Sequence, residues 1–507
     1  MSRRIEKVLV ANRGEIAVRV IQGLREMGIG SVAVYSEPDR EALHALVADE
    51  AYPIGPAPAA ESYLVAERLV ETALAAGADA VHPGYGFLAE NAGFARLCAE
   101  AGLLFIGPRP ETIELMGNKL AARRKMLESG VPVIPGTDAA VADPDAAVAA
   151  AREIGFPVLL KAAAGGGGKG MRVVRDEGEI AAALRQTMGE AQSAFGDGSV
   201  YIERFVERPK HIEVQVLGDG RGGAVHVFER ECSVQRRHQK VIEESPSPSL
   251  TPELREQICA AAVRTAESVE YLGAGTVEFI LSPDGEFFFL EMNTRLQVEH
   301  PVTELVTGTD LVRAQVRIAE TGELPYRQQD LRQRGWAIEM RLYAEDPARN
   351  FAPSIGRITT LVAPAGPGVR LDSGIYEGFD VPIHYDPLLA KLTVWGEDRD
   401  QAIARARRAL GELVLHGPGH NVPFHLWALD HPAFRDGSYT TDFVAEHFAP
   451  DRLFPAPDDD TRFALLAAAA LAEERRRLAQ TAEREHRCAT TVTNWRLDAL
   501  RRMTGSR

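Results

Sequence analysis

The strongest constraint on the fold is a pair of short apolar segments that carry acidic residues where a strand core is normally filled by carbon. The segments Gly275–Leu281 and Phe287–Asn293 both read as β-strands, and an Asp-Gly turn lies between them. If the Asp-Gly pair forms a two-residue tip, Glu278 lies directly opposite Glu291. The sequence therefore predicts an antiparallel hairpin with two carboxylates facing each other.

Hard oxygen ligands gather on one face of this predicted hairpin. Side chains alternate along a strand, so Asn293 shares the face of Glu291. Such oxygens suit Mg²⁺ or Mn²⁺, usually shared with substrate phosphates. A solvated hairpin face is the alternative for a lone Glu-x-Asn pair. Three such groups beside a Phe-rich strand favour a divalent-metal site made by Glu278, Glu291 and Asn293.

Composition narrows the class of protein. A chain of 507 residues should hold about two to four domains. A net charge of −15 argues against non-specific binding to nucleic acids or anionic membranes. The cysteines lack C-x-x-C spacing, no stretch reaches transmembrane length, and the N-terminus leads into a strand without a secretory signal. We therefore expect a cytoplasmic protein without a disulfide framework or a zinc site.

Alternating strand and helix patterns predict two α/β units in the first part of the chain. Residues 1–115 open with strand, helix and strand, but the first turn lacks a full G-x-G-x-x-G, so dinucleotide binding is not supported. Residues 116–325 form the second α/β region, with a compact subregion at about 135–205.

The rest of the chain changes character twice. Residues 330–448 alternate short strands with one long helix near 398–414. Beyond a Pro- and Asp-rich stretch, residues 456–507 predict a helical extension, with a helical pattern over 462–487 followed by a basic end.

A glycine run follows a predicted strand that ends at Lys161. The run spans Ala162–Gly170, and glycines let backbone N–H groups approach a phosphate chain closely. It does not fit the Walker pattern G-x-x-x-x-G-K-[ST]. A flexible turn is the alternative, but the flanking Lys161 and Lys169 favour polyphosphate binding. Lys119 could add a phosphate contact, although a surface lysine at a helix start is its ordinary interpretation.

A second polar segment, Cys232–Lys240, is dense in hydrogen-bond donors and poor in carboxylates. Such a segment can hold a small anion through charge-assisted hydrogen bonds, while an exposed basic strand is the alternative. Cys232 lacks a partner at catalytic spacing and is interpreted as a buried thiol. His211 could bond a nucleotide, although a lone histidine is more often structural.

A candidate acid–base pair follows the predicted metal strand. Arg295 and Glu299 lie there beside Gln297 and His300. A carboxylate beside a fixed guanidinium predicts a general base acting on a bound acid anion, with the arginine stabilising developing negative charge. A structural ion pair is the alternative.

Taken together, these segments resemble the ATP-grasp superfamily and, within it, biotin carboxylase. The resemblance covers about residues 4–448, and the order and joint occurrence of its motifs are highly specific. The motifs are Ala11–Arg19, His82–Asn91, Lys161 with the glycine loop, Arg230–Lys240, Glu291–Glu304 and Tyr385–Lys391.

The resemblance implies a fold and a nucleotide site. The fold would be an N-terminal Rossmann-like domain, an ATP-grasp domain with a mobile lid, and a C-terminal α+β domain. The lid would be the 135–205 subregion. The positions that match ATP contacts in the family are Lys119, Lys161, Gly167, Gly168, Glu203, Arg204, Phe205, Val206, His211, His238, Glu278 and Glu291. Glu278, Glu291 and Asn293 also match the metal ligands, for which two Mg²⁺ or Mn²⁺ ions are expected.

The resemblance also implies the reaction. Lys240, Arg295, Gln297 and the backbone at Val298 match the bicarbonate site, and Glu299 matches the general base. Arg295 and Arg341 match contacts to biotin or carboxyphosphate. An ATP-dependent ligase of this kind phosphorylates bicarbonate to carboxyphosphate, which then carboxylates biotin.

Partners follow from the same resemblance. No Ala-Met-Lys-Met biotin-attachment motif occurs, so we expect biotin on a separate carboxyl carrier protein, together with carboxyltransferase subunits. The family commonly forms homodimers, and Arg19 matches an interface position. Acetyl-CoA or propionyl-CoA is the first choice for the final acceptor, and a two-subunit pyruvate carboxylase is the second. A carboxylate–amine ligase and a regulatory ATP-binding protein are more distant alternatives.

Three departures from the family pattern stand out. Ala164 replaces the outer glycine of a longer run, and Pro418-Gly-His420 stands where the family usually has an Ile/Val-Lys-Thr-type run. The hairpin between Glu278 and Glu291 is one residue longer than in the bacterial acetyl-CoA carboxylase component.

Overall fold

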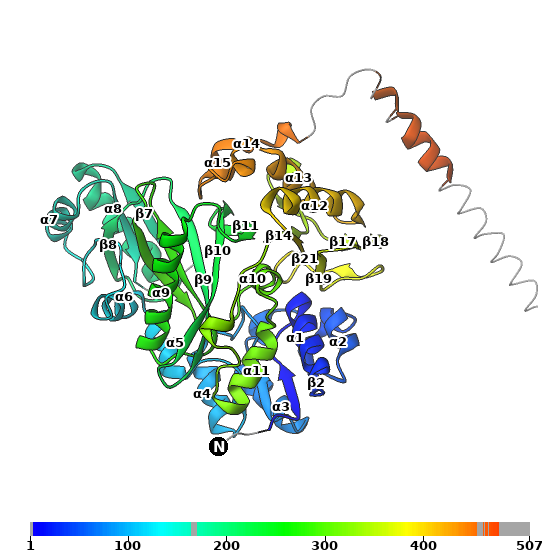
Figure 1. Ribbon diagram of the computed structural model, residues 1–507, viewed down its shortest axis with the longest axis horizontal. Helices are drawn as coiled ribbons and strands as arrows, with labels where there is room; N and C mark the ends of the chain where they lie inside the picture. The colour runs from blue at the N-terminus through cyan, green and yellow to red at the C-terminus, as the bar shows by residue number, and fades with distance from the viewer. Residues whose placement is uncertain (1–3, 164–169, 454–459, 461, 465, 476–507) are drawn as a thin grey trace, which may run out of the picture. The chain divides into compact units, whose positions relative to one another are not determined.

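The structure, a computed structural model, describes residues 4–163, 170–453, 460, 462–464 and 466–475 (Figure 1). Two compact units divide the chain, Met1–Phe448 and Ala449–Arg507. The first unit contains every predicted site residue that the structure describes.

A five-stranded parallel sheet forms the N-terminal part of the first unit. Its strands stand in the order β3-β2-β1-β4-β5, so the order reverses beside β1 and the carboxyl ends of β1 and β4 are neighbours. In parallel sheets this reversal is where ligand-binding loops meet. Asn12 joins the two loops there by donating to the carbonyls of Pro83 and Tyr85, both at 2.8 Å. The strands are β1 Lys7–Val10, β2 Gly30–Ser36, β3 Glu50–Gly55, β4 Ala80–His82 and β5 Leu104–Phe105.

Helices connect these strands, as the alternating pattern predicts for a parallel sheet. The amphipathic helix α1 begins directly after the Asn12 turn and buries its apolar face. The helices of this region are α1 Gly14–Glu26, α2 Leu43–Val47, α3 Ala66–Ala75, α4 Ala92–Glu100 and α5 Pro110–Gly117.

A small antiparallel sheet with its own apolar core lies in the subregion predicted to be a lid. Its order is β7-β6-β8, and two helices cover it. The elements are α7 Pro144–Ile154, β6 Val158–Ala162, β7 Met171–Val174, α8 Ile180–Phe195 and β8 Val200–Arg204. The helix α6 Lys119–Glu128 precedes them.

An eight-stranded antiparallel sheet joins the second region, residues 116–325, to the third region, residues 330–448. Its order is β13-β12-β9-β10-β11-β14-β21-β19. Because β11 pairs with β14, residues on either side of position 330 share one continuous sheet. The strands are β9 Lys210–Asp219, β10 Ala224–Arg236, β11 Gln239–Ser245, β12 Leu272–Leu281, β13 Phe287–Asn293, β14 Trp336–Tyr343, β19 Val369–Ser373 and β21 Leu388–Gly396.

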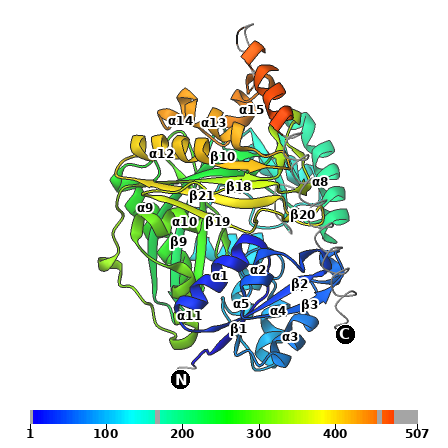
Figure 2. The same cartoon turned by 90° about the vertical axis from the view of Figure 1, so that its right-hand side faces the viewer.

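Helices pack on both faces of the β14–β21 half of this sheet. Helix α12 contacts β14 and β21 from one face, and α1 and α10 contact β19, β21 and β14 from the other (Figure 2). The contact with α1 brings the N-terminal region against the third region. The helices around the sheet are α9 Pro252–Ser268, α10 His300–Thr307, α11 Leu311–Thr321, α12 Arg399–Glu412, α13 Val422–Asp430, α14 Pro432–Arg435 and α15 Phe443–His447.

Short strands and single 3₁₀ turns complete the described elements. The strands are β15 Glu345–Asp346, β16 Ala352–Pro353, β17 Gly356–Arg357, β18 Thr360–Val362, β20 Asp380–Val381 and β22 Val414–His416. The turns are η1 Glu37–Asp39, η2 Ala59–Glu61, η3 Glu177–Glu179, η4 Gln328–Asp330, η5 Pro347–Arg349 and η6 Pro450–Arg452.

The β12–β13 hairpin confirms the predicted pairing of Glu278 with Glu291 but not the predicted tip. The Ser282 N–H donates to the Glu286 carbonyl at 2.8 Å, so three residues form the loop instead of two. A register shift next to Phe279 leaves Leu290 as an extra residue, which restores the expected pairing further along the strands. Two departures from a regular hairpin therefore cancel before the acidic residues are reached.

In the second unit, residues 462–464 and 466–475 are helical, within the span predicted to be a helix. The rest of that predicted helix and the basic end lie outside the described residues. No helix in the described ranges is both long and apolar enough to cross a lipid bilayer.

Candidate active site

The β12–β13 hairpin brings the three predicted metal residues onto one face. Glu278 is paired with Glu291, and Asn293 is paired with Thr276 two positions away. The side-chain amide of Asn293 donates to Glu278 Oε1 at 2.9 Å. The carboxylates and the amide are therefore neighbours, as their spacing along the strands predicts.

The two hairpin carboxylates have opposite pKa shifts. Burial, followed by repulsion from Glu278, raises the pKa of Glu291 above its ordinary value, and Lys119 offsets this only in part. Burial alone would raise the pKa of Glu278 as well, but Lys240 and His211 outweigh it and hold this pKa well below its usual range. Nearby positive charge therefore outweighs burial at Glu278 but not at Glu291, so an added cation at the pair would be stabilised.

One ammonium group joins three carboxylates beside the hairpin. Lys240, near the start of β11, donates to Glu278 at 2.8 Å, to Glu299 at 2.7 Å and also to Glu213. Burial lowers the pKa of Lys240, but the three carboxylates outweigh burial and raise it well above its ordinary value. Lys240 is therefore a fixed positive charge where the predicted metal face meets the predicted base.

Glu299 lies at the centre of this cluster and is 1% exposed. Its second oxygen accepts from Arg341 Nη2 at 3.0 Å, and Arg341 also bonds Glu243 at 2.6 Å. Burial would raise the pKa of Glu299, but Lys240, Arg341 and Arg230 outweigh it and hold the pKa below its usual range. Glu299 is thus ionised at neutral pH and able to accept a proton.

The guanidinium in contact with Glu299 belongs to Arg341 and not to Arg295, which corrects the pairing expected from the sequence. Arg295 Nε donates to Glu90 at 2.8 Å, and its Nη2 donates to Asn293 Oδ1 at 2.9 Å. Glu90 comes from the loop between β4 and α4. Arg295 therefore links the N-terminal region to the predicted metal face. The negative charge of Glu299 still stabilises the charged form of Arg295, although the two side chains are not hydrogen-bonded.

Two lysines approach the same hairpin from the predicted nucleotide side. Lys161 on β6 forms a buried ion pair of 2.5 Å with Glu203 on β8. Burial lowers the pKa of Lys161, but Glu203 outweighs it and the pKa is raised. Burial lowers the pKa of Lys119, at the first position of α6, and Glu291 partly opposes this shift. Both lysines interact electrostatically with Glu291, so the lid strand, α6 and the hairpin face a shared region.

The end of β8, where the expected ATP contacts Arg204, Phe205 and Val206 lie, is also close to the hairpin. Arg204 bonds Glu286 at 3.0 Å, and its guanidinium lies 5.0 Å from the centre of the Phe288 ring. The Phe205 N–H donates to the Pro157 carbonyl at 2.9 Å, and Val206 follows it as a half-buried residue. The predicted phosphate-binding residues Gly167 and Gly168, and the departure at Ala164, lie outside the described residues.

The two histidines matched to nucleotide contacts have different surroundings. His211 is buried, with Nδ1 3.0 Å from the Gln235 amide and Nε2 3.0 Å from Glu278 Oε2. His238 is exposed at the tip between β10 and β11. The backbone is left-handed at both tip residues, with φ 51° at Arg237 and 66° at His238. Such a tip usually contains Asn or Gly, so local strain is held next to Lys240.

Arg230 organises the cluster through its hydrogen bonds, a role that the sequence motifs do not predict. Its fully buried guanidinium bonds five side chains, from Glu213, Gln215, Thr276, Gln297 and Thr303. Gln297 in turn donates to Glu278 at 2.8 Å. A signal was available, because period-two spacing puts His211, Glu213 and Gln215 on one face of β9.

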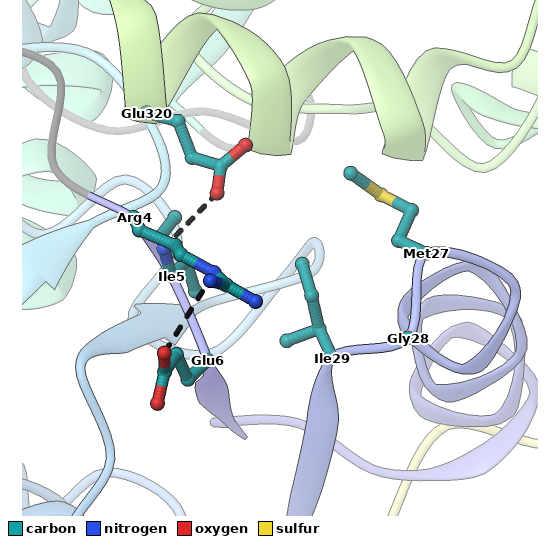
Figure 3. A pocket seen from close by; sticks show the side chains of 7 residues that line it. All are labelled: Arg4, Ile5, Glu6, Met27, Gly28, Ile29 and Glu320. Carbon is teal, nitrogen blue, oxygen red and sulfur yellow. Dashed lines mark hydrogen bonds and ion pairs between the residues drawn. The ribbon is translucent and has the colours of Figure 1, made fainter.

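A surface hollow lies away from these residues. It measures about 380 Å³ and is lined by Arg4, Glu6, Met27, Ile29 and Glu320, among others (Figure 3). Glu320 accepts from the Ile5 N–H at 3.0 Å, and Arg4 lies 3.7 Å from Glu6. None of the clustered acidic or basic groups described above lines it, so the chemistry points to the hairpin and not to this hollow.

Three family profiles match successive parts of the chain. Residues 4–113 match "Biotin carboxylase, N-terminal domain", and residues 118–327 match "Carbamoyl-phosphate synthase L chain, ATP binding domain". Residues 339–446 match "Biotin carboxylase C-terminal domain".

Individual proteins agree with these matches. The chain is 53% identical to a pyruvate carboxylase subunit of Methanothermobacter thermautotrophicus, over 87% of this chain and 90% of that protein. It is 51% identical to "Biotin carboxylase 1" of Bacillus subtilis, over 87% of this chain and 98% of that protein.

A solved structure shows the same fold. The biotin carboxylase domain dimer of Hydrogenobacter thermophilus 2-oxoglutarate carboxylase superimposes with a TM-score of 0.85 at 48% identity, over 90% of this chain and 100% of that one. That structure is described as a complex with MgADP, ADP and bicarbonate. Profiles, identities and fold together show that this chain belongs to the biotin carboxylase family of ATP-grasp ligases.

Proposed function

We propose that this chain carboxylates biotin with ATP and bicarbonate at the cluster formed by Lys240, Glu299 and Arg341. The observation that carries the proposal is the position of Lys240, whose single ammonium bonds both Glu278 and Glu299. A small anion held by Lys240 would lie between the phosphate-binding face and a carboxylate base. Phosphoryl transfer to bicarbonate requires this arrangement, because base, anion and phosphate must be adjacent.

A divalent metal fits the hairpin face. The positive charges near Glu291 do not offset its burial and the repulsion from Glu278, and both carboxylates offer hard oxygens to a cation. Glu278, Glu291 and Asn293 would hold Mg²⁺ or Mn²⁺. When bound, the metal would neutralise negative charge on the phosphate chain of ATP.

The nucleotide would be held by groups from the lid, α6 and the hairpin. Lys119 and Lys161 are the cations closest to this role, since both interact with Glu291 across the shared region. We propose that the lid closes over ATP through its glycine loop. The proposed nucleotide contacts are Lys119, Lys161, Gly167, Gly168, Glu203, Arg204, Phe205, Val206, His211, His238, Glu278 and Glu291.

Bicarbonate would be bound by Lys240, Arg295, the Gln297 side chain and the Val298 backbone. Glu299 would take its proton, and the freed oxygen would attack the γ-phosphorus of ATP, so that ADP leaves and carboxyphosphate forms. Carboxyphosphate would then break down to CO₂ and phosphate. Fixed positive charge around Glu299 supports the anion through both steps.

Biotin would react next to the same groups. The phosphate released from carboxyphosphate would take the N1 proton of biotin, and the ring would then attack CO₂. Arg295 would stabilise the enolate that forms, and Arg341 would bind the biotin or carboxyphosphate end. Arg341 can contribute to both, because its guanidinium already touches Glu299.

We further propose that biotin is linked to a separate carrier protein and that the chain works as a homodimer beside carboxyltransferase subunits. Support comes from the Bacillus relative, which bears the name of a biotin carboxylase and is covered over 98% of its length. The Hydrogenobacter domain, described as a dimer, supports the assembly. Arg19 matches an interface position in the family. Here it is buried against Glu304 and Asp310 of the same chain, so it would support the dimer interface indirectly, by holding these two residues in place.

The final acceptor would be chosen by the carboxyltransferase. Relatives at 53% and 51% identity carry a pyruvate carboxylase name and a biotin carboxylase name, so similarity alone does not separate acceptors. An acyl-CoA carboxylase is the first assembly to test, and a two-subunit pyruvate carboxylase is the second. Identifying the co-purifying carboxyltransferase distinguishes them.

Release of ADP from ATP tests the reaction itself. The protein is assayed with and without bicarbonate, and with free biotin added or omitted. The proposal expects ADP release that requires bicarbonate and increases with biotin. Release that instead requires a carboxylic acid and an amine would identify a carboxylate–amine ligase. ATP binding without turnover under every condition would identify a regulatory nucleotide-binding protein.

A further inference from the structure

The loop between β13 and α10 is held by two of its own carbonyl groups. His300 Nδ1 lies 2.9 Å from the carbonyl oxygen of Gln297, and Lys391 Nζ lies 2.8 Å from the carbonyl oxygen of Val298. Both holding side chains are fully buried. Two consecutive peptide groups are therefore fixed by groups that do not reach the proposed reaction centre.

The chemistry of the carbonyl determines which nitrogen of His300 carries the proton. A carbonyl oxygen only accepts, so Nδ1 must donate to Gln297. Burial, and then the positive charges of Lys391, Arg19 and Arg370, lower the pKa of His300 well below its ordinary value. The ring is therefore neutral, with Nε2 bare. Nε2 has no hydrogen-bond partner in the described part of the chain, as a bare nitrogen facing the Glu304 carboxylate at 4.0 Å requires.

Peptide planarity turns the His300 bond into an orientation of the site. In a trans peptide the carbonyl and the next N–H point in opposite directions. Fixing the Gln297 carbonyl on His300 therefore aims the Val298 N–H away from His300. The side chains on both sides of Val298 reach one cluster, since Gln297 bonds Glu278 and Glu299 bonds Lys240.

Lys391 anchors the next peptide to two other parts of the first unit. Its ammonium lies 3.2 Å from Glu15 on α1 and 3.8 Å from Asp372 on β19. The same reasoning fixes the Glu299 N–H, and with it the start of the Glu299 side chain. Contacts with α1 and β19 therefore hold Lys391 in place, and Lys391 in turn holds the Val298 carbonyl next to Glu299.

We propose that His300 and Lys391 are positioning residues that aim the Val298 N–H and the Glu299 carboxylate at bound bicarbonate. The inference rests on the proposed function of this loop as the bicarbonate site. It assigns two buried side chains to the affinity for one substrate, and it predicts no role for them in binding ATP.

Paired substitutions at His300 test the inference. His300→Leu removes the donor, whereas His300→Asn puts an amide N–H close to the place of Nδ1. Bicarbonate- and biotin-dependent ADP release is measured to give KM for bicarbonate and for ATP. His300→Leu should raise the KM for bicarbonate about tenfold or more, the size expected when the support of a ligand-holding group is lost. The KM for ATP should stay the same, and His300→Asn should recover most of the loss.

His44 offers a matched control. It is also fully buried, and its Nε2 lies 3.2 Å from the Val34 carbonyl in the N-terminal sheet. His44→Leu removes a comparable bond between a histidine and a carbonyl away from the cluster. This variant should lose stability while its KM for bicarbonate remains that of the wild type.

A second variant keeps the inference testable if His300→Leu does not fold. Lys391→Met combined with Glu15→Gln removes one buried charge of each sign and frees the Val298 carbonyl. It should also raise the KM for bicarbonate and leave the KM for ATP unchanged. For whichever variant folds, an unchanged KM for bicarbonate, or equal changes for both substrates, would overturn the inference. Failure of His300→Asn to recover what His300→Leu loses would overturn it as well.

The wild-type assay separates this inference from the function beneath it. A wild type whose ADP release does not depend on bicarbonate would overturn both. A bicarbonate-dependent wild type with insensitive variants would overturn the positioning role alone.

Discussion

At the scale of single residues, the carboxylates of the proposed centre are paired with cationic side chains of the same chain. Lys240 is shared by Glu213, Glu278 and Glu299, and each bond lowers the energy of the charged forms on both sides. A bound bicarbonate would compete with these carboxylates for the same ammonium. We expect Glu299 to become more basic at that moment, because it would lose part of its positive surroundings.

Removing the ammonium should expose this coupling. Lys240 is the first of the charges that lower the pKa of Glu278 and of Glu299, so Lys240→Met should raise both pKa values. A base with a higher pKa is protonated at higher pH, so the acid limb of the pH profile of kcat/KM should move to higher pH. The measurement is bicarbonate-dependent ADP release across pH.

Lys210→Met is the control for that experiment. Lys210 is also partly buried, but its ammonium bonds the Gly437 carbonyl and faces the Tyr439 ring. Its loss should leave the acid limb in place. An acid limb that stays fixed in Lys240→Met would show that Glu299 does not set it.

Sequence reasoning located the acidic face because strand periodicity is local. Glu278, Glu291 and Asn293 follow from alternation along two adjacent strands. The contact partner of Glu299 could not be found in this way. Arg295 follows the last residue of β13 by two positions, where alternation no longer applies, and Arg341 comes from a strand 42 positions further along the chain. Only the folded sheet brings β14 beside β11.

At the scale of elements, the hairpin shows how the right pairing can arise from the wrong tip. Pro283, Asp284 and Gly285 form a three-residue loop, and Gly285 has a φ of 85°. A proline at the first position and a left-handed glycine at the last position are typical of such three-residue loops. The bulge at Leu290 has no signal in the composition of the strand, because an extra leucine in an apolar run looks like any other strand residue.

Two glycine substitutions should have opposite effects on stability. Gly285→Ala forces a side chain into left-handed backbone and should lower the free energy of unfolding by about 1 kcal/mol. Gly189→Ala, inside α8 with open space around its Cα, should raise it by up to about 1 kcal/mol. Urea unfolding measures both changes. A stabilising Gly285→Ala would contradict the left-handed tip.

The lid subregion should respond to ATP more than the N-terminal sheet does. Its small sheet has a separate apolar core, so it can move as a body. Hydrogen exchange with and without ATP is the measurement. We expect added protection concentrated between residues 135 and 205. Equal added protection of residues 1–115 would contradict a lid.

At the scale of the first unit, buried ion pairs join regions that are far apart in the sequence. Arg19 on α1 bonds Glu304 and Asp310 at 3.0 and 2.8 Å, and Arg370 on β19 bonds the same Glu304 at 2.7 Å. The sequence divides these residues among three regions, and its periodic patterns do not show which charges pair. The alternating strand and helix pattern predicted an α/β region at residues 1–115, whereas the continuous sheet across position 330 depends on the pairing of β11 with β14.

Buried histidines should make this unit sensitive to acid. Burial lowers the pKa of His44, His82 and His425 to about 4. In the unfolded chain the ordinary pKa is about 6.5, so between these values the unfolded state binds more protons and stability falls as pH falls. Each group should cost about 3 kcal/mol by pH 4.

Urea unfolding between pH 7 and pH 5 tests the predicted loss of stability. This range covers the upper part of the interval between the unfolded and folded pKa values. His44→Leu should reduce the dependence of stability on pH, because one of the contributing groups is gone. The same dependence in wild type and variant would mean that His44 is protonated equally in the folded and unfolded states.

The most direct test of the central claim is the turnover of Glu299→Gln. The amide keeps the size of the side chain but cannot take a proton from bicarbonate at neutral pH. Biotin-dependent ATP cleavage should fall by a factor on the order of 10² to 10⁴. ATP affinity should be retained, because Glu278, Glu291 and Asn293 are untouched. Glu244→Gln is the control, since Glu244 is buried on the same strand as Lys240 and bonds Arg399 at 2.8 Å. It should lose stability and keep its turnover. If Glu299→Gln binds ATP normally and turns over at nearly the wild-type rate, Glu299 is not the base.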